Sequence, residues 1–197
     1  MASLNEMINH RLVRRFMLII PVIFFLNPVA GQKKNYRFYY YTADQGLSQN
    51  IIDCILKDSR DYMWFGTRNG LNRFDAYEFT VFKKNQEDTN SLSSNFIRAL
   101  CEDRHGNIWV GTNEGLNRYL FWEDRFISYT GDSMDNLPFH DIRVNSILSD
   151  HSGDLWIGTD NGVVLHAGGR FAPLAGGAGK GVTVYDILAD REGMLVV

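Results

Sequence analysis

DRHGNIWVGTNEGLNRY, which runs from Asp103 to Tyr119, is the stretch of sequence that decides the fold. It has the pattern of a tight turn, a short strand, a second turn and a second strand. Related stretches occupy residues 58–74 and 150–166, and the beginning of a fourth copy occupies residues 190–197. Recurrence with a period of about 40–47 residues is the signature of a repeat protein, so the array has to be interpreted before any single motif.

Each repeat is expected to contain four short strands. The first is marked by two large apolar residues spaced three apart, and the second is a run rich in Ile, Leu and Val. The third contains Trp-x-Gly-Thr, and the fourth contains Gly-Leu-Asn-Arg or a variant of it. First strands are expected at residues 38–41, 79–82, 126–129 and 171–174, and second strands at residues 51–57, 96–102, 142–149 and 182–189.

Four short strands per repeat, with Trp and Gly at constant places, are typical of a β-propeller blade. We therefore predict an all-β fold, a β-propeller of four-stranded blades, of which the chain holds about three and a half. WD-type blades have a similar period, but their Gly-His and Trp-Asp dipeptides are missing. An all-β solenoid would have shorter repeats.

The third strand of every complete repeat carries one Trp and one Gly at matching positions, namely Trp64 and Gly66, Trp109 and Gly111, and Trp156 and Gly158. The Trp side chains could stack on sugar rings, but their recurrence favours a place in the core between blades. A Gly inside a strand marks the close approach of a neighbour, for which we expect the Trp of the adjacent repeat. Arg73 and Arg118 also match; they could bind an acidic sugar, although bridging neighbouring blades is favoured.

The turn before each Trp strand follows the pattern Asp-x-x-Gly. Asp can accept hydrogen bonds from the backbone just after it, and Gly supplies a positive φ. The first repeat has Asp61 in place of Gly, and Asp tolerates this geometry next best. The turn resembles the Asp-box of sialidase-type propellers, one residue longer, and there it is an element of the fold.

Charge and cysteine content exclude several classes of protein. The formal net charge is -3 and basic runs are missing, so the chain lacks the electrostatic footprint of a nucleic-acid-binding protein. Cys54 and Cys101 lie in the second strands of different repeats. A disulfide would be possible in an oxidising compartment, but free buried thiols are expected.

The N-terminal residues 1–31 have the pattern of a secretory signal peptide. Three Arg precede an apolar run from residue 16 to residue 26, and Val29, Ala30 and Gly31 are small residues at a suitable cleavage point. The run is shorter than the ~20 residues of a membrane-spanning helix. An uncleaved anchor is the alternative. We expect the mature chain, residues 32–197, to be one partial β-propeller sensor domain.

The blocks Gly46-Leu47-Ser48 and Trp64-Phe65-Gly66-Thr67, with their copies in residues 92–119 and 145–165, resemble the two-component regulator propeller repeat. The resemblance implies the periplasmic sensor of a hybrid two-component histidine kinase. In that family a signal peptide leads into tandem propellers and a membrane helix, followed by a cytoplasmic kinase. The family implies an oligosaccharide ligand, further propeller blades and a membrane-linked kinase as partners, a homodimer when complete, and control of polysaccharide-utilisation genes.

Ligand contacts are expected from residues that differ between repeats, because matched residues are committed to packing. The candidates are the loops 86–90, 121–125 and 131–140, together with Tyr39, Trp122, Phe139 and His140. The acidic pairs of these loops are interpreted as solvated side chains, so we predict no catalytic residue, no metal site and no cofactor for this chain.

Two other functional classes stay open. One is a secreted propeller enzyme that acts on glycans, a lyase or a glycosidase, and the other is the sensor of a diguanylate cyclase. The chain ends within the fourth repeat, so we expect an N-terminal fragment whose outermost sheets expose apolar side chains. Residues 32–197 alone are then expected to associate and to bind no oligosaccharide.

Overall fold

The computed structural model describes residues 37–130, 142–174, 181–190 and 195–196. The chain divides into two units, residues 1–39 and residues 40–197. Only residues 37–39 of the first unit are described; they are exposed and form no strand. The predicted signal segment, 1–31, lies outside the described residues.

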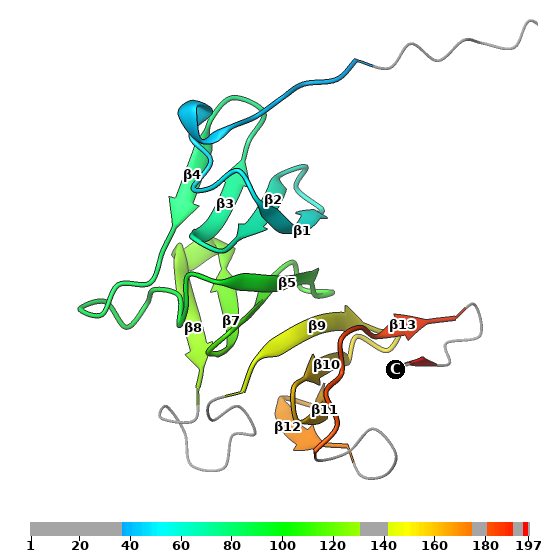
Figure 1. The fold of residues 1–197 in the computed structure, drawn as a ribbon. Helices are drawn as coiled ribbons and strands as arrows, with labels where there is room; N and C mark the ends of the chain where they lie inside the picture. Colours follow the sequence, from blue (N-terminus) through cyan, green and yellow to red (C-terminus); the bar gives the residue numbers. More distant parts are fainter. Residues whose placement is uncertain (1–36, 131–141, 175–180, 191–194, 197) are drawn as a thin grey trace, which may run out of the picture. The chain divides into compact units, whose positions relative to one another are not determined.

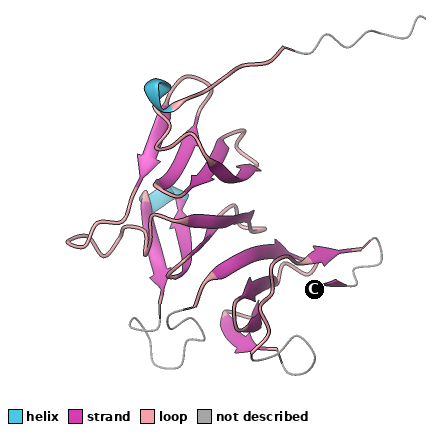
Figure 2. Cartoon of the chain, viewed as in Figure 1, coloured by secondary structure: helices cyan, strands magenta, loops and turns pink. Residues whose placement is uncertain are grey.

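The described residues of the second unit form three sheets of four consecutive antiparallel strands and one short two-stranded sheet near the C-terminus (Figures 1 and 2). The expected all-β fold built from four-stranded blades is confirmed. The first blade is β1 (Ile52–Lys57), β2 (Met63–Thr67), β3 (Gly70–Phe74) and β4 (Phe79–Phe82); the second is β5 (Ile97–Glu102), β6 (Ile108–Thr112), β7 (Gly115–Leu120) and β8 (Arg125–Tyr129); the third is β9 (Val144–Ser149), β10 (Leu155–Thr159), β11 (Gly162–Ala167) and β12 (Arg170–Pro173).

The sequence pattern predicted that the strands with paired aromatic residues begin the blades. This prediction is wrong, because each of these strands is the last strand of its blade. β4 pairs with β3, and β8 pairs with β7, so each aromatic strand is the last of the sheet that precedes it. The short connection 75–78 holds β4 next to β3, whereas the longer loop 83–96 separates β4 from β5. A repeating sequence pattern is cyclic, and its starting point is therefore set by the strand pairing.

The ends of the array also differ from the predicted strands. Residues 38–41 form no strand, and the strand expected at 182–189 is reduced to β13 (Leu188–Ala189), which pairs with β14 (Leu195–Val196). Two short 3-10 helices, η1 (Ala43–Gln45) and η2 (Phe121–Glu123), lie outside the sheets.

The first strands of the blades, β1, β5 and β9, follow one another along one side of the unit, and β1 contacts β5 as β5 contacts β9 (Figure 1). Because neighbouring strands are antiparallel, each blade has two ends. We call the end with the loops into β1, β5 and β9 the loop end; the β2–β3, β6–β7 and β10–β11 turns lie there too. The opposite end, with the Asp-x-x-Gly turns, is the Asp-turn end.

The core consists of apolar clusters between successive blades. Trp64, Leu71, Ile97 and Val110 belong to the cluster between the first and second blades. The cluster between the second and third includes Trp109, Leu116, Val144 and Ile157. The outer face of the first blade is open, and Ile51 and Ile55 there are 54% and 58% exposed. Apolar side chains are thus exposed at the first blade, as expected from the repeat pattern.

The Leu-Ser pairs before β1 and β5 fasten the loop-end segments to their blades. Leu47 and Leu92 are buried, and each following Ser donates its backbone N–H to a buried Asn of the third strand. The acceptors are Asn72 and Asn117. The third blade has Val164 at this position, so this fastening is specific to the first two blades.

Candidate functional site

The Asp-x-x-Gly turns are self-contained hydrogen-bonded units. Asp103 accepts hydrogen bonds from the backbone N–H groups of His105 and Asn107 and, through Oδ2, from Trp109 Nε1 at 2.8 Å. Burial raises the pKa of the Asp103 carboxyl, but these donors lower it overall below its usual value. Asp58 and Asp150 accept from Trp64 and Trp156 in the same way. These carboxylates are occupied by their own turns.

The positive φ expected at the fourth turn position occurs in all three turns. Asp61, Gly106 and Gly153 have φ values of 69°, 76° and 82°. The first repeat therefore holds a non-Gly residue in the left-handed region, and its side chain forms an ion pair with Lys57.

The matched Trp side chains lie in the packing between blades. Trp64 and Trp109 are 0% and 1% exposed, and Trp156 is partly buried against Val163, Val184 and Ile187. Tyr119, from the next blade, packs its ring 5.4 Å from that of Trp64. Trp64 is fully enclosed by protein and offers no open face to a sugar, whereas Trp109 borders a cavity that is described below.

The sequence analysis predicted that the strand glycines face the Trp of the adjacent repeat. This prediction is wrong, because Gly66 and Gly111 face the first strand of the next blade. A methyl group on Gly66 would lie 2.7 Å from Ile97, and one on Gly111 would lie 2.6 Å from Val144. A methyl group on Gly158 would lie 2.5 Å from Ser146 Oγ of its own blade and 2.7 Å from Val184, which precedes β13. The neighbouring side chains already occupy the space where a Cβ would lie, so only glycine fits at these positions.

The positions that differ between blades come together at the loop end. Each first strand has a break in register at the same repeat position, where one residue is left out of the pairing: Asp53, Arg98 and Asn145. A β-bulge of this kind redirects a side chain and is common beside functional sites. Three blades thus present a carboxylate, a guanidinium and an amide at one equivalent position.

These bulge residues form hydrogen bonds that join neighbouring blades. Arg98 donates from Nε to Asn145 Oδ1 at 2.9 Å and from Nη1 to Asn113 Oδ1 at 3.2 Å. Asn145 in turn donates to the carbonyl of Val184. Asp53 pairs with Arg68 of its own blade at 3.4 Å. We call Asp53, Arg98, Asn145 and their neighbours Arg68 and Phe96 the bulge cluster.

An aromatic ring and additional charges accompany this cluster. The Phe96 ring lies 5.1 Å from the Arg68 guanidinium and 5.4 Å from that of Arg98. In the third blade, Arg143 forms an ion pair with Asp160 of the β10–β11 turn at 3.2 Å. The loop end therefore offers donors, acceptors and an aromatic surface, while the repeated residues below it maintain the fold.

At the Asp-turn end, the interface between the first and second blades is closed. Arg73 donates from Nη1 to the hydroxyl of Tyr119 at 3.0 Å, and this hydroxyl donates to Asp124 at 2.5 Å. The Arg60 guanidinium lies 4.4 Å from the ring centre of Phe121, a residue of η2. Burial, followed by the hydrogen bond to Asp124, raises the pKa of Tyr119 to about 12.

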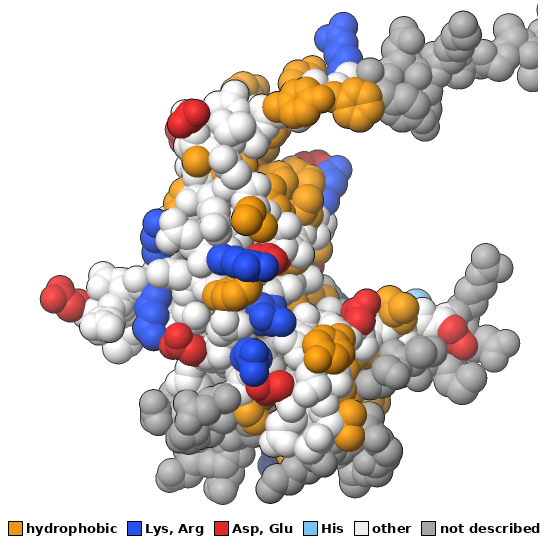
Figure 3. Space-filling model, in the orientation of Figure 1, with side chains coloured by type: hydrophobic (Ala, Val, Ile, Leu, Met, Phe, Trp, Pro, Cys, Tyr) orange, Lys and Arg blue, Asp and Glu red, His pale blue; other side chains and the backbone are white. Residues whose placement is uncertain are grey.

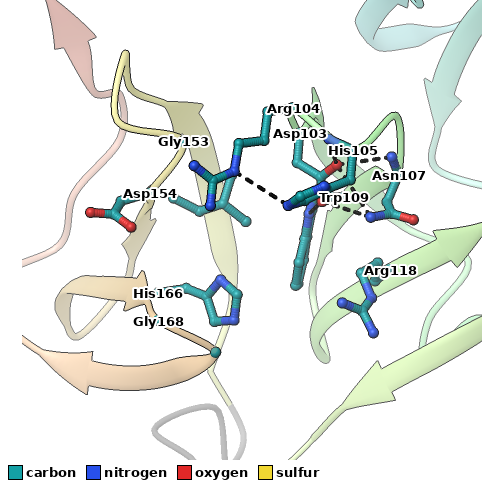
Figure 4. A pocket seen from close by; sticks show the side chains of 12 residues that line it. Asp103, Arg104, His105, Asn107, Trp109, Arg118, Gly153, Asp154, His166 and Gly168 are labelled. Atoms are coloured by element: carbon teal, nitrogen blue, oxygen red, sulfur yellow. Dashed lines mark hydrogen bonds between the residues drawn. The ribbon is translucent and has the colours of Figure 1, made fainter.

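The interface between the second and third blades is open at the same place. A cavity of about 300 Å³ lies there, lined by Trp109, Arg118, His166 and both Asp turns (Figure 4). Arg118 lies over the Trp109 ring, 5.4 Å from its centre, and the His166 ring is 5.3 Å from it. Burial, and then the nearby Arg118, lower the pKa of His166 below its usual value.

The candidates predicted from sequence are scattered over the structure. Loop 86–90 lies at the loop end and is exposed, whereas 121–125 lies at the Asp-turn end. Tyr39 and Trp122 are 70% and 87% exposed. Loop 131–140, with Phe139 and His140, lies outside the described residues. The sequence reasoning missed Asp53, Arg98 and Asn145, although comparing matched positions of the aligned repeats would have found them.

The two cysteines are free thiols, as expected, and lie between different pairs of blades. Burial raises the pKa of Cys54 to about 12 and that of Cys101 to about 11. Across the described part of the chain, no group of three or more His, Cys, Asp or Glu side chains is placed to hold a metal ion. The described residues also contain no helix with the length and hydropathy of a membrane span.

A known family of repeat proteins matches the part of the chain that forms the blades. The model of the two component regulator propeller family matches residues 46–69, 91–114 and 136–161. These three segments are similar to the repeat of that family and together make up less than half of the chain. Each matched segment includes the β-hairpin that carries the Trp and Gly of its blade, so the family pattern coincides with the fold-maintaining residues.

One curated relative is similar to part of this chain. Histidine kinase P4 of Formosa agariphila is 39% identical to this chain over 62 residues, which are 32% of this chain and 4% of the relative. The matched region is therefore a small part of a much longer protein.

Solved structures share the fold. The extracellular domains of the proteins named hybrid two component system BT4673 and BT3049, both from B. thetaiotaomicron, superpose with TM-scores of 0.64 and 0.65 at 23% and 20% identity. The matches cover 79% and 81% of this chain but 21% and 22% of those chains. Virginiamycin B lyase from Staphylococcus aureus superposes with a TM-score of 0.53 at 16% identity, over 72% of this chain and 46% of the lyase. At these identities the likeness concerns the fold.

Proposed function

We propose that this chain forms part of the ligand-sensing propeller of a hybrid two-component histidine kinase. The proposal is supported by the three propeller repeats, by the kinase relative and by the extracellular domains that share the fold. The observation that carries it is the bulge cluster. Equivalent bulges present three different polar side chains at one end of the unit, while the repeated Trp, Gly and Asp residues maintain the blades.

The ligand we propose is an oligosaccharide released from a glycan. Sugars are bound by converging amide, carboxylate and guanidinium groups next to an aromatic surface. Asp53, Arg98 and Asn145 supply these three groups, and Phe96 supplies the ring. Basic and acidic side chains are interspersed on the face shown in Figure 3, which suits a ligand of low charge better than a nucleic acid.

The remaining parts of the proposal concern the whole protein. Residues 1–31 would direct export to the periplasm, and further blades would complete the propeller. A membrane-linked kinase, working as a homodimer, would carry the signal to polysaccharide-utilisation genes. This chain itself would not be an enzyme; a glycan lyase or glycosidase is the alternative, and the sensor of a diguanylate cyclase is another.

Oligosaccharide binding to the protein produced from its full reading frame tests the proposal. A panel of glycan digests would be screened by calorimetry, together with kinase autophosphorylation. Arg98→Gln removes the charge between Asn145 and Asn113, and we expect it to weaken binding about tenfold, as for loss of a charge-assisted hydrogen bond. Trp122→Ala, at the Asp-turn end, is the matched control and should bind as well as the unmodified protein.

The opposite pattern would contradict the proposal. If Trp122→Ala abolished binding and Arg98→Gln did not, the ligand would bind away from the bulge cluster. Turnover of the glycan by the purified protein, with release of unsaturated or hydrolysed products, would instead favour the enzyme.

A further inference from the structure

Arg73 and Arg118 occupy the same repeat position but differ in what they contact. Arg73 is satisfied by Tyr119, whose hydroxyl is backed by the Asp124 carboxylate. Arg118 Nε is buried, and no hydrogen-bond acceptor reaches it within the described ranges. A buried guanidinium N–H without an acceptor is costly, because it has lost water and gained no partner.

Three replacements in the sequence open the space beside Arg118. His166 stands where the second blade has Tyr119, and it is too short to reach the guanidinium as Tyr119 reaches Arg73. Asn107 stands where the first blade has Tyr62. The turn Gly168-Gly169 replaces η2, so the third blade has no counterpart of Phe121 or Asp124.

We propose that the cavity between the second and third blades binds a small organic monocarboxylate, which pairs with Arg118 and His166 over the Trp109 ring. The site is separate from the bulge cluster, because the cavity opens at the Asp-turn end (Figure 4). The first interface shows the chemistry that fits: its Arg is satisfied by a hydroxyl that is itself bonded to a carboxylate. A bound carboxylate would supply the group that this blade lacks.

The charges around the cavity favour a single negative charge. Two Arg, Arg104 and Arg118, are balanced by two Asp, Asp103 and Asp154, and the remaining titratable groups are His105 and His166. Asp103 is already occupied by the donors of its own turn. A monoanion can pair with Arg118 and draw a proton onto His166, whereas a dianion would leave an uncompensated charge next to Asp154.

The shape of the cavity limits the size of the ligand. At about 30 Å³ for each water of the liquid, a volume of about 300 Å³ holds roughly ten waters, or an organic ligand of about ten to fifteen heavy atoms, because bonded atoms lie closer together than waters. The flat guanidinium can bind a carboxylate through two parallel hydrogen bonds. Among the described residues, no atom lies within 4 Å of the place where a Cβ of Gly168 or Gly169 would be, so these two residues leave space at the edge of the cavity.

The experiment uses the protein from its full reading frame and three carboxylates of increasing size: acetate, lactate and gluconate. Acetamide and lactamide are the neutral controls, and inorganic phosphate at pH 8 is the dianion. Binding is followed by the indole N–H signal of Trp109 in NMR spectra. We expect saturable shifts with the carboxylates, tighter binding of gluconate than of acetate, and no saturable shift with the amides or phosphate.

Three variants test the site. Arg118→Gln should weaken carboxylate binding about tenfold, as expected for loss of a charge-assisted hydrogen bond. Arg73→Gln changes the matched residue of the closed interface and should leave binding unchanged. His166→Tyr should fill the cavity and give Arg118 a hydroxyl, so binding should be lost while the melting temperature is kept or raised.

Several outcomes would overturn the proposal. Equal shifts with acetate and acetamide would mean that the cavity does not select charge. Unchanged binding in both Arg118→Gln and His166→Tyr would place the carboxylate elsewhere. Phosphate binding as tight as gluconate binding would contradict the argument for a monoanion.

Discussion

The two blade interfaces of this unit are built from the same repeat, but one is filled by side chains and the other contains a cavity. Between the first and second blades, Tyr119, Asp124 and Phe121 fill the Asp-turn end and satisfy Arg73. Between the second and third, the corresponding space is a cavity beside Arg118. The Trp and Gly residues are identical at both, so the residues that differ between repeats decide whether an interface is closed or open. A cavity lowers stability compared with an interface that is filled by side chains.

Removing the matched Trp side chains should have the largest effect. Trp64→Ala and Trp109→Ala should each cost about 3–5 kcal/mol of unfolding free energy, as for large aromatic residues in cores. The cost at Trp64 should be the greater, because Phe82 and Tyr119 enclose it whereas Trp109 borders the cavity. Urea unfolding of both variants measures the difference, and a higher cost at Trp109 would mean that the open interface carries more of the stability.

Removing one hydroxyl group should reveal a second difference in stability between the two interfaces. Tyr119→Phe leaves Arg73 and Asp124 without their shared partner, which should cost about 1–3 kcal/mol. The matched change His166→Phe replaces one ring with another next to Trp109 and should stay within about 1 kcal/mol. If both changes cost the same, the network at the closed interface would add nothing to its stability.

Acid should weaken the open interface at a pH where the closed one is unaffected. The folded-state pKa of His166 lies below its usual value of 6.5, because of burial and Arg118, against the opposing influence of Asp103 and Asp154. Below that usual value, the unfolded chain takes up a proton that the folded chain resists, so stability falls as the pH drops from 6.5 toward the folded pKa. The other charged or titratable side chains that line the cavity are Asp103, Arg104, His105, Arg118 and Asp154.

The variant His166→Phe should reduce this slope of stability against pH between pH 7 and 5. The variant His105→Asn, at an exposed residue that also lines the cavity, is measured in parallel so that the two histidines can be told apart. If the slope of stability against pH persisted in His166→Phe and disappeared in His105→Asn, His105 and not His166 would be its cause.

The smallest difference should appear in thiol reactivity, which does not alter stability. Cys54 lies at the closed interface and Cys101 at the open one. Their pKa values, about 12 and about 11, keep both thiols protonated at pH 8. Labelling of the native protein with a maleimide should be slow at both sites and faster at Cys101; faster labelling of Cys54 would show that the first interface opens more readily.

Much of the fold could be predicted because local chemistry repeats in the sequence. The Asp turns, including the positive φ at Asp61, follow from hydrogen bonding within five residues. The assignment of strands to blades could not be predicted in the same way. A strand such as β4 has a β-hairpin partner on one side and a loop on the other, and only the pairing with β3 shows to which blade it belongs.

The candidate site was predicted less well than the fold. Exposed aromatic residues such as Trp122 stand out in a sequence, but this one lies at the end away from the bulge cluster. Asp53, Arg98 and Asn145 look like ordinary residues of alternating strands. Their common role depends on a bulge, which is a property of the pairing between two strands.

By itself, the sequence of this protein determines the repeat, the turn chemistry and the residues that must be buried, because each depends on neighbours within a few positions along the chain. Only the tertiary structure decides what meets between blades. Gly66 faces Ile97, and Arg73 reaches Tyr119, while Arg118 Nε has no hydrogen-bond acceptor among the described residues. These contacts join residues more than thirty positions apart. Their geometry is set by how closely successive sheets pack, which no local pattern encodes.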